Sequence, residues 1–189
     1  MRGKNNRYEE LIKNYTEGDL DLSGCEIKHL ELDHVSGSLN LSKANIGTLS
    51  IGWVSNELNM SGAEIKNITN PIDAESVIMT GANIKKLPAH VYTNYFDISR
   101  SNISKLNTEI RANTLNIRNT KIESLPKDLK VRTLIVDSKT AKNMSLLTLK
   151  NCESIDMDSV VYSSSTISAS MRDYNFCSVA ENCENFCRA

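Results

Sequence analysis

The chain has no apolar run that approaches the roughly 18 residues of a membrane-spanning helix. Residues 1–19 are polar and contain no apolar stretch ahead of a small-residue cleavage site, which argues against a secretory signal. The formal net charge is −1, so the overall balance gives no electrostatic reason to expect a nucleic-acid or anionic-membrane ligand. We therefore expect a cytoplasmic protein whose five cysteines are reduced thiols.

The sequence also lacks the motifs that carry common catalytic chemistry. It has no glycine-rich phosphate loop, no HExxH zinc motif and no nucleophile elbow, and its three histidines occupy unrelated positions. The nearest approach to a metal site is the cysteine group Cys177, Cys183 and Cys187, with Cys152 further away. Structural zinc sites usually pair ligands two to four residues apart, and the spacing of five and then three intervening residues between these cysteines matches no standard arrangement, so packing of small buried thiols explains them better. We predict no catalytic activity, no cofactor and no metal.

What the sequence does contain is a repeat of 19 residues. A pair of apolar residues separated by one residue, polar in five of the repeats, recurs seven times without an insertion, at Leu20/Leu22, Leu39/Leu41, Leu58/Met60, Val77/Met79, Phe96/Ile98, Leu115/Ile117 and Leu134/Val136. An isoleucine follows five positions after the pair in six repeats, at Ile27, Ile46, Ile65, Ile84, Ile103 and Ile122. A small residue precedes each isoleucine by two positions: Cys25, Ala44, Ala63, Ala82, Ser101 and Thr120. The seventh repeat has Lys139 and Ala141 at these positions and departs from the pattern.

This spacing has a direct structural meaning. An apolar residue on each side of a polar one is the signature of a short strand with one buried face. Repetition at a fixed interval stacks equivalent strands in parallel, about 4.8 Å apart, around one shared apolar core. The small residue suits a tight bend, where a large side chain would collide with the next coil. The pattern therefore predicts a repeat solenoid, mainly β with short turns, in which the isoleucines fill the interior.

The segment from Leu115 to Pro126, with leucines or isoleucines at its repeat positions, resembles the short leucine-rich repeats of bacterial and phage proteins. These often carry Leu-Pro after the strand, as Leu87-Pro88 also does here. The resemblance covers residues 20–150 and implies a partner-binding strand face, in the host cytoplasm if the protein is phage-encoded. The period is shorter than the usual roughly 20 to 29 residues, and the bend lacks the usual asparagine. A three-sided parallel β-helix therefore stays open as an alternative.

The two ends of the repeat array need caps. We divide the chain into an N-terminal helical cap (residues 1–19), a solenoid of seven coils (20–154), and a C-terminal cap and tail (155–189). Residues 6–16 predict an amphipathic helix that covers the first coil with Tyr8, Leu11, Ile12 and Tyr15. Residues 155–157 and 160–162 predict two final strands, and residues 173–188 a short helix.

Outward residues beside the apolar pairs form what we call the strand face. Most of it is a ladder of Asn and Ser, a pattern that also suits hydrogen bonds between neighbouring coils. Larger groups interrupt the ladder near its centre, and we predict these as partner-binding residues: Ile78, Tyr95, Asp97, Arg100 and Arg118. Tyr and Arg are enriched among residues that dominate interface energies. Trp53, the only tryptophan, lies on the return side of the second coil, where it is either packed or, if exposed, a binding anchor.

These observations favour a non-enzymatic protein-binding module, such as a phage or bacterial inhibitor or adaptor. An alternative is nucleic-acid binding, because residues 80–150 carry 13 Lys and Arg against 5 Asp and Glu. The basic residues fall at different repeat positions and need not share a face: Lys85, Lys86, Arg100, Arg111, Arg118, Lys127, Lys130 and Arg132. A third hypothesis is self-association through exposed terminal strands.

Overall fold

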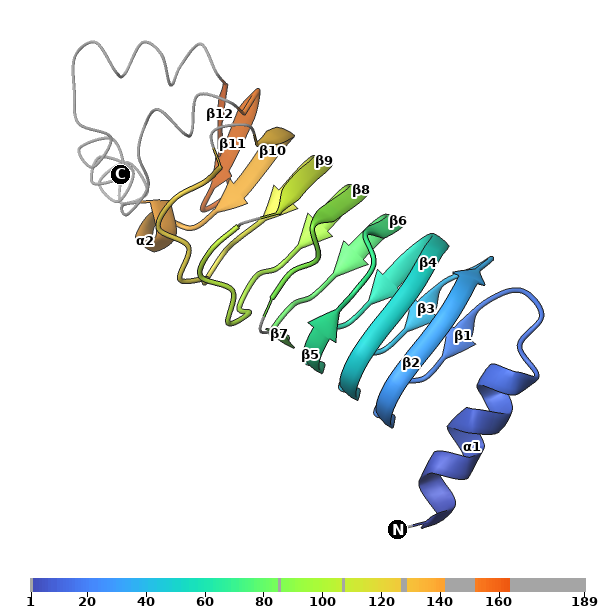
Figure 1. Ribbon diagram of the computed structural model, residues 1–189. Coiled ribbons are helices and arrows are strands. Elements are labelled where there is room, and N and C mark those ends of the chain that lie inside the picture. Colours follow the sequence, from blue (N-terminus) through green and yellow to red (C-terminus); the bar gives the residue numbers. More distant parts are fainter. Residues whose placement is uncertain (1, 85, 107, 127–128, 142–151, 164–189) are drawn as a thin grey trace, which may run out of the picture.

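The computed structural model describes residues 2–84, 86–106, 108–126, 129–141 and 152–163. The chain forms a stack of parallel β coils that runs from a helix at the N-terminal end to a hairpin at the other (Figure 1). The apolar pairs begin in a row of neighbouring strands: β1 (Leu20–Asp21), β3 (Leu39–Asn40), β4 (Asn45–Asn59), β6 (Ile72–Ile78), β8 (His90–Asp97), β9 (Glu109–Asn116) and β10 (Lys130–Val136). None of the helices in the described part of the chain is long and apolar enough to cross a membrane.

The strand register confirms the predicted period. Leu20 lies opposite Leu39, Phe96 lies opposite Leu115, and the first apolar residues of the repeats up to Leu134 are likewise paired 19 residues apart. The last step is longer, because Leu134 lies opposite Ile155 in β11 (Ser154–Met157). A fixed period keeps the apolar side chains of successive coils one above the other, so the structure is a β-solenoid of about seven turns.

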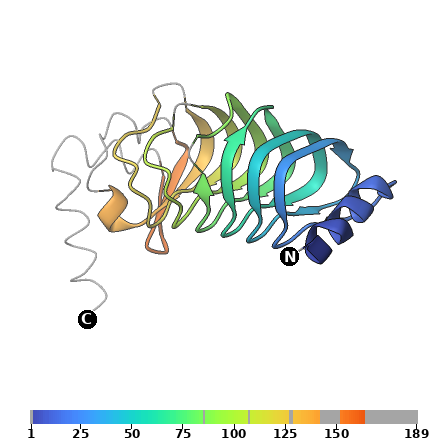
Figure 2. The same cartoon turned by 60° about the horizontal axis from the view of Figure 1, so that its bottom comes forward.

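Strands also line the other sides of the coils. β2 (Glu26–Val35) pairs with β4 along its length, and β5 (Glu64–Ile68) and β7 (Asn83–Ile84) continue this ladder. Seen from below, the coils therefore form closed loops around one interior (Figure 2). The last part of each coil leads back to the next apolar pair. We call the outer surface of this part the return face. On this stretch a bulge between Val54 and Glu57 shifts the register of β4 against β6 by one residue.

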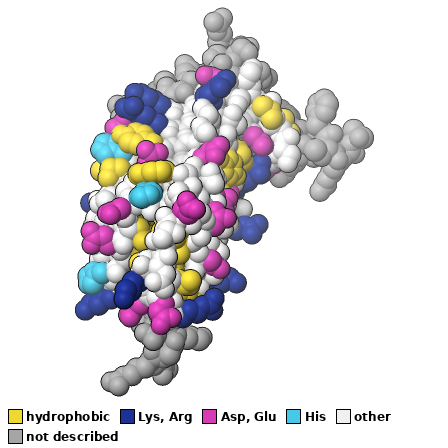
Figure 3. Space-filling view, turned by 90° about the vertical axis from the view of Figure 1, so that its right-hand side faces the viewer, with side chains coloured by type: hydrophobic (Ala, Val, Ile, Leu, Met, Phe, Trp, Pro, Cys, Tyr) yellow, Lys and Arg dark blue, Asp and Glu magenta, His cyan; other side chains and the backbone are white. Residues whose placement is uncertain are grey.

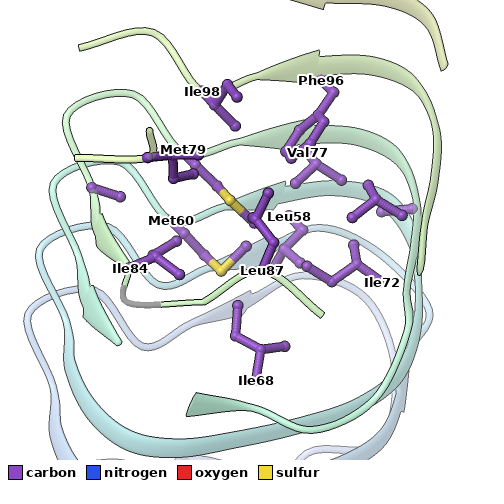
Figure 4. Packing of buried hydrophobic residues seen from close by; sticks show 14 of the residues in the cluster. Leu58, Met60, Ile68, Ile72, Val77, Met79, Ile84, Leu87, Phe96 and Ile98 are labelled. Carbon is purple, nitrogen blue, oxygen red and sulfur yellow. The ribbon is translucent and has the colours of Figure 1, made fainter. Parts of the chain in front are cut away.

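The core occupies the interior of the stack. Both members of every apolar pair are buried, and Leu58, Met60, Val77, Met79 and Phe96 point inward from successive coils (Figure 4). Five of the six predicted isoleucines are buried, and Ile27 is partly buried because it belongs to the first coil. This shared interior is the arrangement that the sequence predicts.

The predicted bend is a four-residue turn after each apolar pair. In the first coil the backbone N–H of Cys25 donates to the carbonyl of Leu22 at 3.2 Å, and Gly24 between them has a φ of 66°. The same left-handed position recurs every 19 residues, at Gly24, Lys43, Gly62, Gly81, Arg100 and Asn119. A positive φ at the third residue is what a type II turn requires. The small fourth residue packs inward, and Cys25 is buried as predicted.

The N-terminal cap is a helix, although its bounds differ from the prediction. α1 (Arg2–Lys13) begins earlier and ends earlier than the predicted 6–16. Tyr8, Ile12 and Tyr15 pack against the core, and the Tyr8 hydroxyl donates to the carbonyl of Ser23 at 2.8 Å. Leu11 is 37% exposed, so its expected place on the covering face is wrong.

At the other end, the two predicted strands are confirmed as β11 and β12 (Val160–Ser163), which form an antiparallel hairpin. The irregular seventh repeat forms a short helix, α2 (Ser138–Ala141), in place of the turn. The Asp137 carboxylate caps this helix by accepting from the backbone N–H of Thr140 at 2.8 Å. The helix expected over residues 173–188, like Cys177, Cys183 and Cys187, lies outside the described residues.

Candidate protein-binding surface

The Asn and Asp ladder of the strand face stabilises the turns. The side chains of Asp21, Asn40, Asn59, Asp97 and Asn116 each accept a hydrogen bond from the backbone N–H two residues later, at 2.8–3.2 Å. These bonds form within a coil, whereas the prediction considered bonds between coils. Asx turns of this kind hold the chain in position for the tight bend that follows. Most of the ladder is therefore part of the scaffold.

Two of the predicted binding residues, Tyr95 and Asp97, belong to a buried polar network. The Tyr95 hydroxyl donates to the Asp97 carboxylate at 3.3 Å, and the Asn116 side chain donates to the same carboxylate at 2.9 Å. Asp97 is buried and Tyr95 half-buried. Burial, together with the negative charge of Asp97, raises the pKa of Tyr95. This network joins two coils and leaves little of either side chain for a partner.

Of the other three predicted residues, Arg100 and Arg118 lie in neighbouring coils, where the backbone N–H of Arg100 donates to the carbonyl of Arg118 at 2.9 Å. Arg118 donates to the Asp156 carboxylate at 2.9 Å, which links its coil to the final hairpin. Ile78 is half-buried beside Asp97 in the neighbouring strand, and Arg100 is exposed at the left-handed position of its turn. The five residues therefore do not form one exposed cluster.

The basic residues of the middle repeats also occupy several sides. Arg111, Lys130 and Arg132 lie on the return face, and two of them are ion-paired, Arg111 with Glu109 at 2.7 Å and Arg132 with Glu153 at 3.1 Å. Arg118 and Arg100 lie on the strand face and at the turn, as described above, and Lys86 follows β7. Lys85 and Lys127 lie outside the described residues.

The return face carries a second ladder, with one exposed or half-exposed side chain from each of six coils. We call it the return ladder, and it consists of His34, Trp53, Asp73, Tyr92, Arg111 and Lys130. His34 lies opposite Trp53, Asp73 opposite Tyr92, and Tyr92 opposite Arg111. Trp53 and Asp73 directly precede the paired residues Val54 and Ala74, so they too stand in neighbouring strands.

Neighbouring members of the return ladder stack on one another. The rings of His34 and Trp53 lie 5.2 Å apart at 18°, and the guanidinium of Arg111 lies 5.4 Å from the centre of the Tyr92 ring. His90 stacks on Tyr92 from within the same strand and contacts Glu109 at 3.1 Å. Trp53 nevertheless remains 47% exposed. Figure 3 shows hydrophobic and histidine side chains lying among acidic and basic ones on this side of the molecule.

Two shallow grooves run along the return face. The first, of about 550 Å³, is lined by Trp53, Asp73, Glu75 and Tyr92 together with residues next to them in the chain. The second, of about 500 Å³, contains Arg111, Lys130, Arg132 and Glu153. Both include Thr93, so they adjoin. The first groove is therefore aromatic and acidic, and the second groove is mixed but mainly basic.

The sequence indicated part of this surface. Tyr92 and Arg111 directly follow the buried residues Val91 and Ile110, so alternation along the strand places both outside. Trp53 gave a mixed signal, because counting by 19 places it in one column with the exposed His34 and with the buried Ile72 and Val91. The bulge after Val54 shifts the register by one residue, so Trp53 lies beside the exposed Asp73 and not beside Ile72.

Comparisons of the chain with family models, curated proteins and solved structures give no match. The candidate site is therefore defined by its geometry. Among the described residues, no three His, Cys, Asp or Glu side chains come together in a way that could hold a metal ion. Burial raises the pKa of the Cys25 and Cys152 thiols to about 11, which keeps both protonated at neutral pH.

Proposed function

We propose that this protein is a non-enzymatic binding module that recognises a partner protein, as an inhibitor or adaptor does, through its return face. One observation carries the proposal: Trp53, the only tryptophan of the chain, is 47% exposed and stacks with His34 in a ladder of aromatic and charged side chains. Leaving a large aromatic surface in water is unfavourable, and exposed Trp, Tyr and Arg are the residues that most often anchor protein interfaces.

The rigidity of the solenoid supports this proposal. The return ladder is built on paired strands, and its aromatic rings are held by stacking with neighbouring coils, so that little side-chain entropy is lost when a partner binds. The strand face, in contrast, uses its polar groups for turns and for contacts between coils. The resemblance to leucine-rich repeats of the bacterial and phage type belongs to the same proposal, and the Leu-Pro steps at Leu87-Pro88 and Leu125-Pro126 support it.

The proposal is tested by affinity purification with the immobilised full chain, followed by quantitative mass spectrometry. Three versions are compared: wild type, the return-face variant Trp53→Ala/Tyr92→Ala, and the strand-face variant Tyr95→Ala/Arg118→Ala. We expect the return-face variant to lose the partner and the strand-face variant, if folded as judged by circular dichroism, to retain it. If the return-face variant retains the same partner as wild type, the return face is not the binding surface.

A further inference from the structure

The first groove of the return face combines two aromatic rings with two carboxylates. Trp53 and Tyr92 border the groove, and Asp73 and Glu75 of the intervening coil lie between them. Both acidic side chains are exposed, and no ion pair to either is formed by the described residues. Aromatic faces and carboxylates share one preference in a ligand, which is a cation.

The spacing of the coils sets the width of this site. Trp53 and Tyr92 stand two coils apart, so at about 4.8 Å per coil their backbones are about 10 Å apart. A flat cation held midway lies about 5 Å from each ring, which is within the roughly 6 Å over which a cation and a ring attract one another. His34 stacks on Trp53, and both Arg111 and His90 lie against the Tyr92 ring, while Trp53 and Tyr92 still line the groove.

The protein already holds one guanidinium group with the same set of partners. Glu109 binds Arg111 at 2.7 Å, and the guanidinium of Arg111 lies over the Tyr92 ring at 5.4 Å. A carboxylate and an aromatic ring thus fix an arginine on one side of Tyr92. On the other side of the same ring, Asp73 supplies the carboxylate and Trp53 supplies a second ring.

We propose that the groove between Trp53 and Tyr92 binds the guanidinium group of an arginine side chain of the partner protein, with Asp73 and Glu75 as its carboxylate acceptors. This inference rests on the proposed function and names the chemistry that the return face recognises. Arginine fits better than lysine because its planar group stacks on rings and donates to a carboxylate through two N–H groups, whereas an ammonium is compact and strongly hydrated.

The test uses the full chain and three short peptides that differ at one residue: acetyl-Gly-Ser-Arg-Ser-Gly-amide and its lysine and citrulline counterparts. Citrulline has nearly the shape of arginine but no charge. Trp53 reports binding by its fluorescence, because it is the only tryptophan and borders the groove. Calorimetry supplies the dissociation constant independently of this reporter. We expect saturable binding of the arginine peptide, weaker binding of the lysine peptide, and none of the citrulline peptide.

Matched variants locate the binding. Asp73→Asn/Glu75→Gln should raise the dissociation constant of the arginine peptide at least about fivefold, since two exposed ion pairs are lost. Tyr92→Leu should weaken binding about threefold while keeping the reporter. The control Glu26→Gln/Glu64→Gln makes the same change in net charge at exposed positions on another side of the coils and should leave the constant within about twofold.

Three results would overturn this inference: no saturable binding of the arginine peptide, equal binding of the lysine or citrulline peptide, or equal weakening by the control variant. None of these results contradicts the proposed function. If the Trp53→Ala/Tyr92→Ala variant no longer binds the partner, the return face is still the protein interface. Conversely, arginine binding in the groove without loss of the partner would refute only the proposed function.

Discussion

At the left-handed turn positions, introducing a glycine and removing a glycine should change the stability of the protein in opposite directions. The six positions have φ between 55° and 66°, and three are occupied by glycine (Gly24, Gly62 and Gly81), while Lys43, Arg100 and Asn119 occupy the others. A residue with a Cβ pays about 1–2 kcal/mol for this conformation. Glycine avoids that cost, but it loses about 0.5–1 kcal/mol of chain entropy on folding. Replacing Arg100 with glycine should therefore stabilise the protein, and replacing Gly81 with alanine should destabilise it.

The expected size of each effect is about 0.5–1 kcal/mol in the free energy of unfolding, the difference of the two terms. Crowding adds nothing at Gly81, since a Cβ built there meets no atom within 4 Å. Arg100 is exposed, and its backbone N–H, which donates to the carbonyl of Arg118, is kept in the glycine variant. Asn119→Gly should gain less than Arg100→Gly, because asparagine tolerates the left-handed region.

The measurement is urea unfolding followed by circular dichroism, with Trp53 fluorescence as a second probe of whether the transition is two-state. We expect a higher midpoint for Arg100→Gly and a lower one for Gly81→Ala, with unchanged slopes. A Gly81→Ala variant as stable as wild type, together with a destabilised Arg100→Gly variant, would refute the reasoning that backbone conformation governs this column.

Three further predictions concern other parts of the fold. Gly52→Ala should destabilise the protein by about 1–3 kcal/mol in urea unfolding. A Cβ at this position would overlap the carbonyl oxygen of Asp33 and force β2 away from β4. Unchanged stability of this variant would contradict the close approach of the two strands. Burial opposes ionisation of Asp137, but hydrogen bonds from backbone N–H groups and from Thr140 outweigh it and lower its pKa below the ordinary 3.8. Its stabilising contribution is therefore present above that pH and lost as the pH falls through the lower folded-state pKa. Asp137→Asn should be less stable than wild type at neutral pH, and the difference in unfolding free energy should shrink in acid. A difference that does not change with pH would count against this prediction. Cys25 and Cys152, both buried with pKa values of about 11, should resist alkylation of the native protein at neutral pH and react after unfolding, as peptide mapping would show.

Much of the fold followed from the sequence because the repeat is regular. A 19-residue period fixes which side chains stack, and both the apolar pairs and the isoleucine column occupy the interior as predicted. The small residue two positions before each isoleucine predicted a tight bend, and the backbone forms a four-residue turn there, as at Leu22 to Cys25. The end caps were predicted less well, since an amphipathic pattern locates a helix such as α1 without fixing where it begins or which residues, Leu11 among them, face the core.

The sequence by itself determined the stack of coils, because a periodic apolar pattern can be buried in only a few ways and every repeat is buried in the same way. It did not determine which surface is free. Alternation shows that Asp97 and Arg118 point away from the core, but only the tertiary structure shows that other coils engage them, Asp97 through Asn116 of the next coil and Arg118 through Asp156 two coils away. Which residue lies beside Trp53 in the next coil was likewise decided by a one-residue bulge between β4 and β6, which depends on the pairing of two coils and does not show in the repeat count.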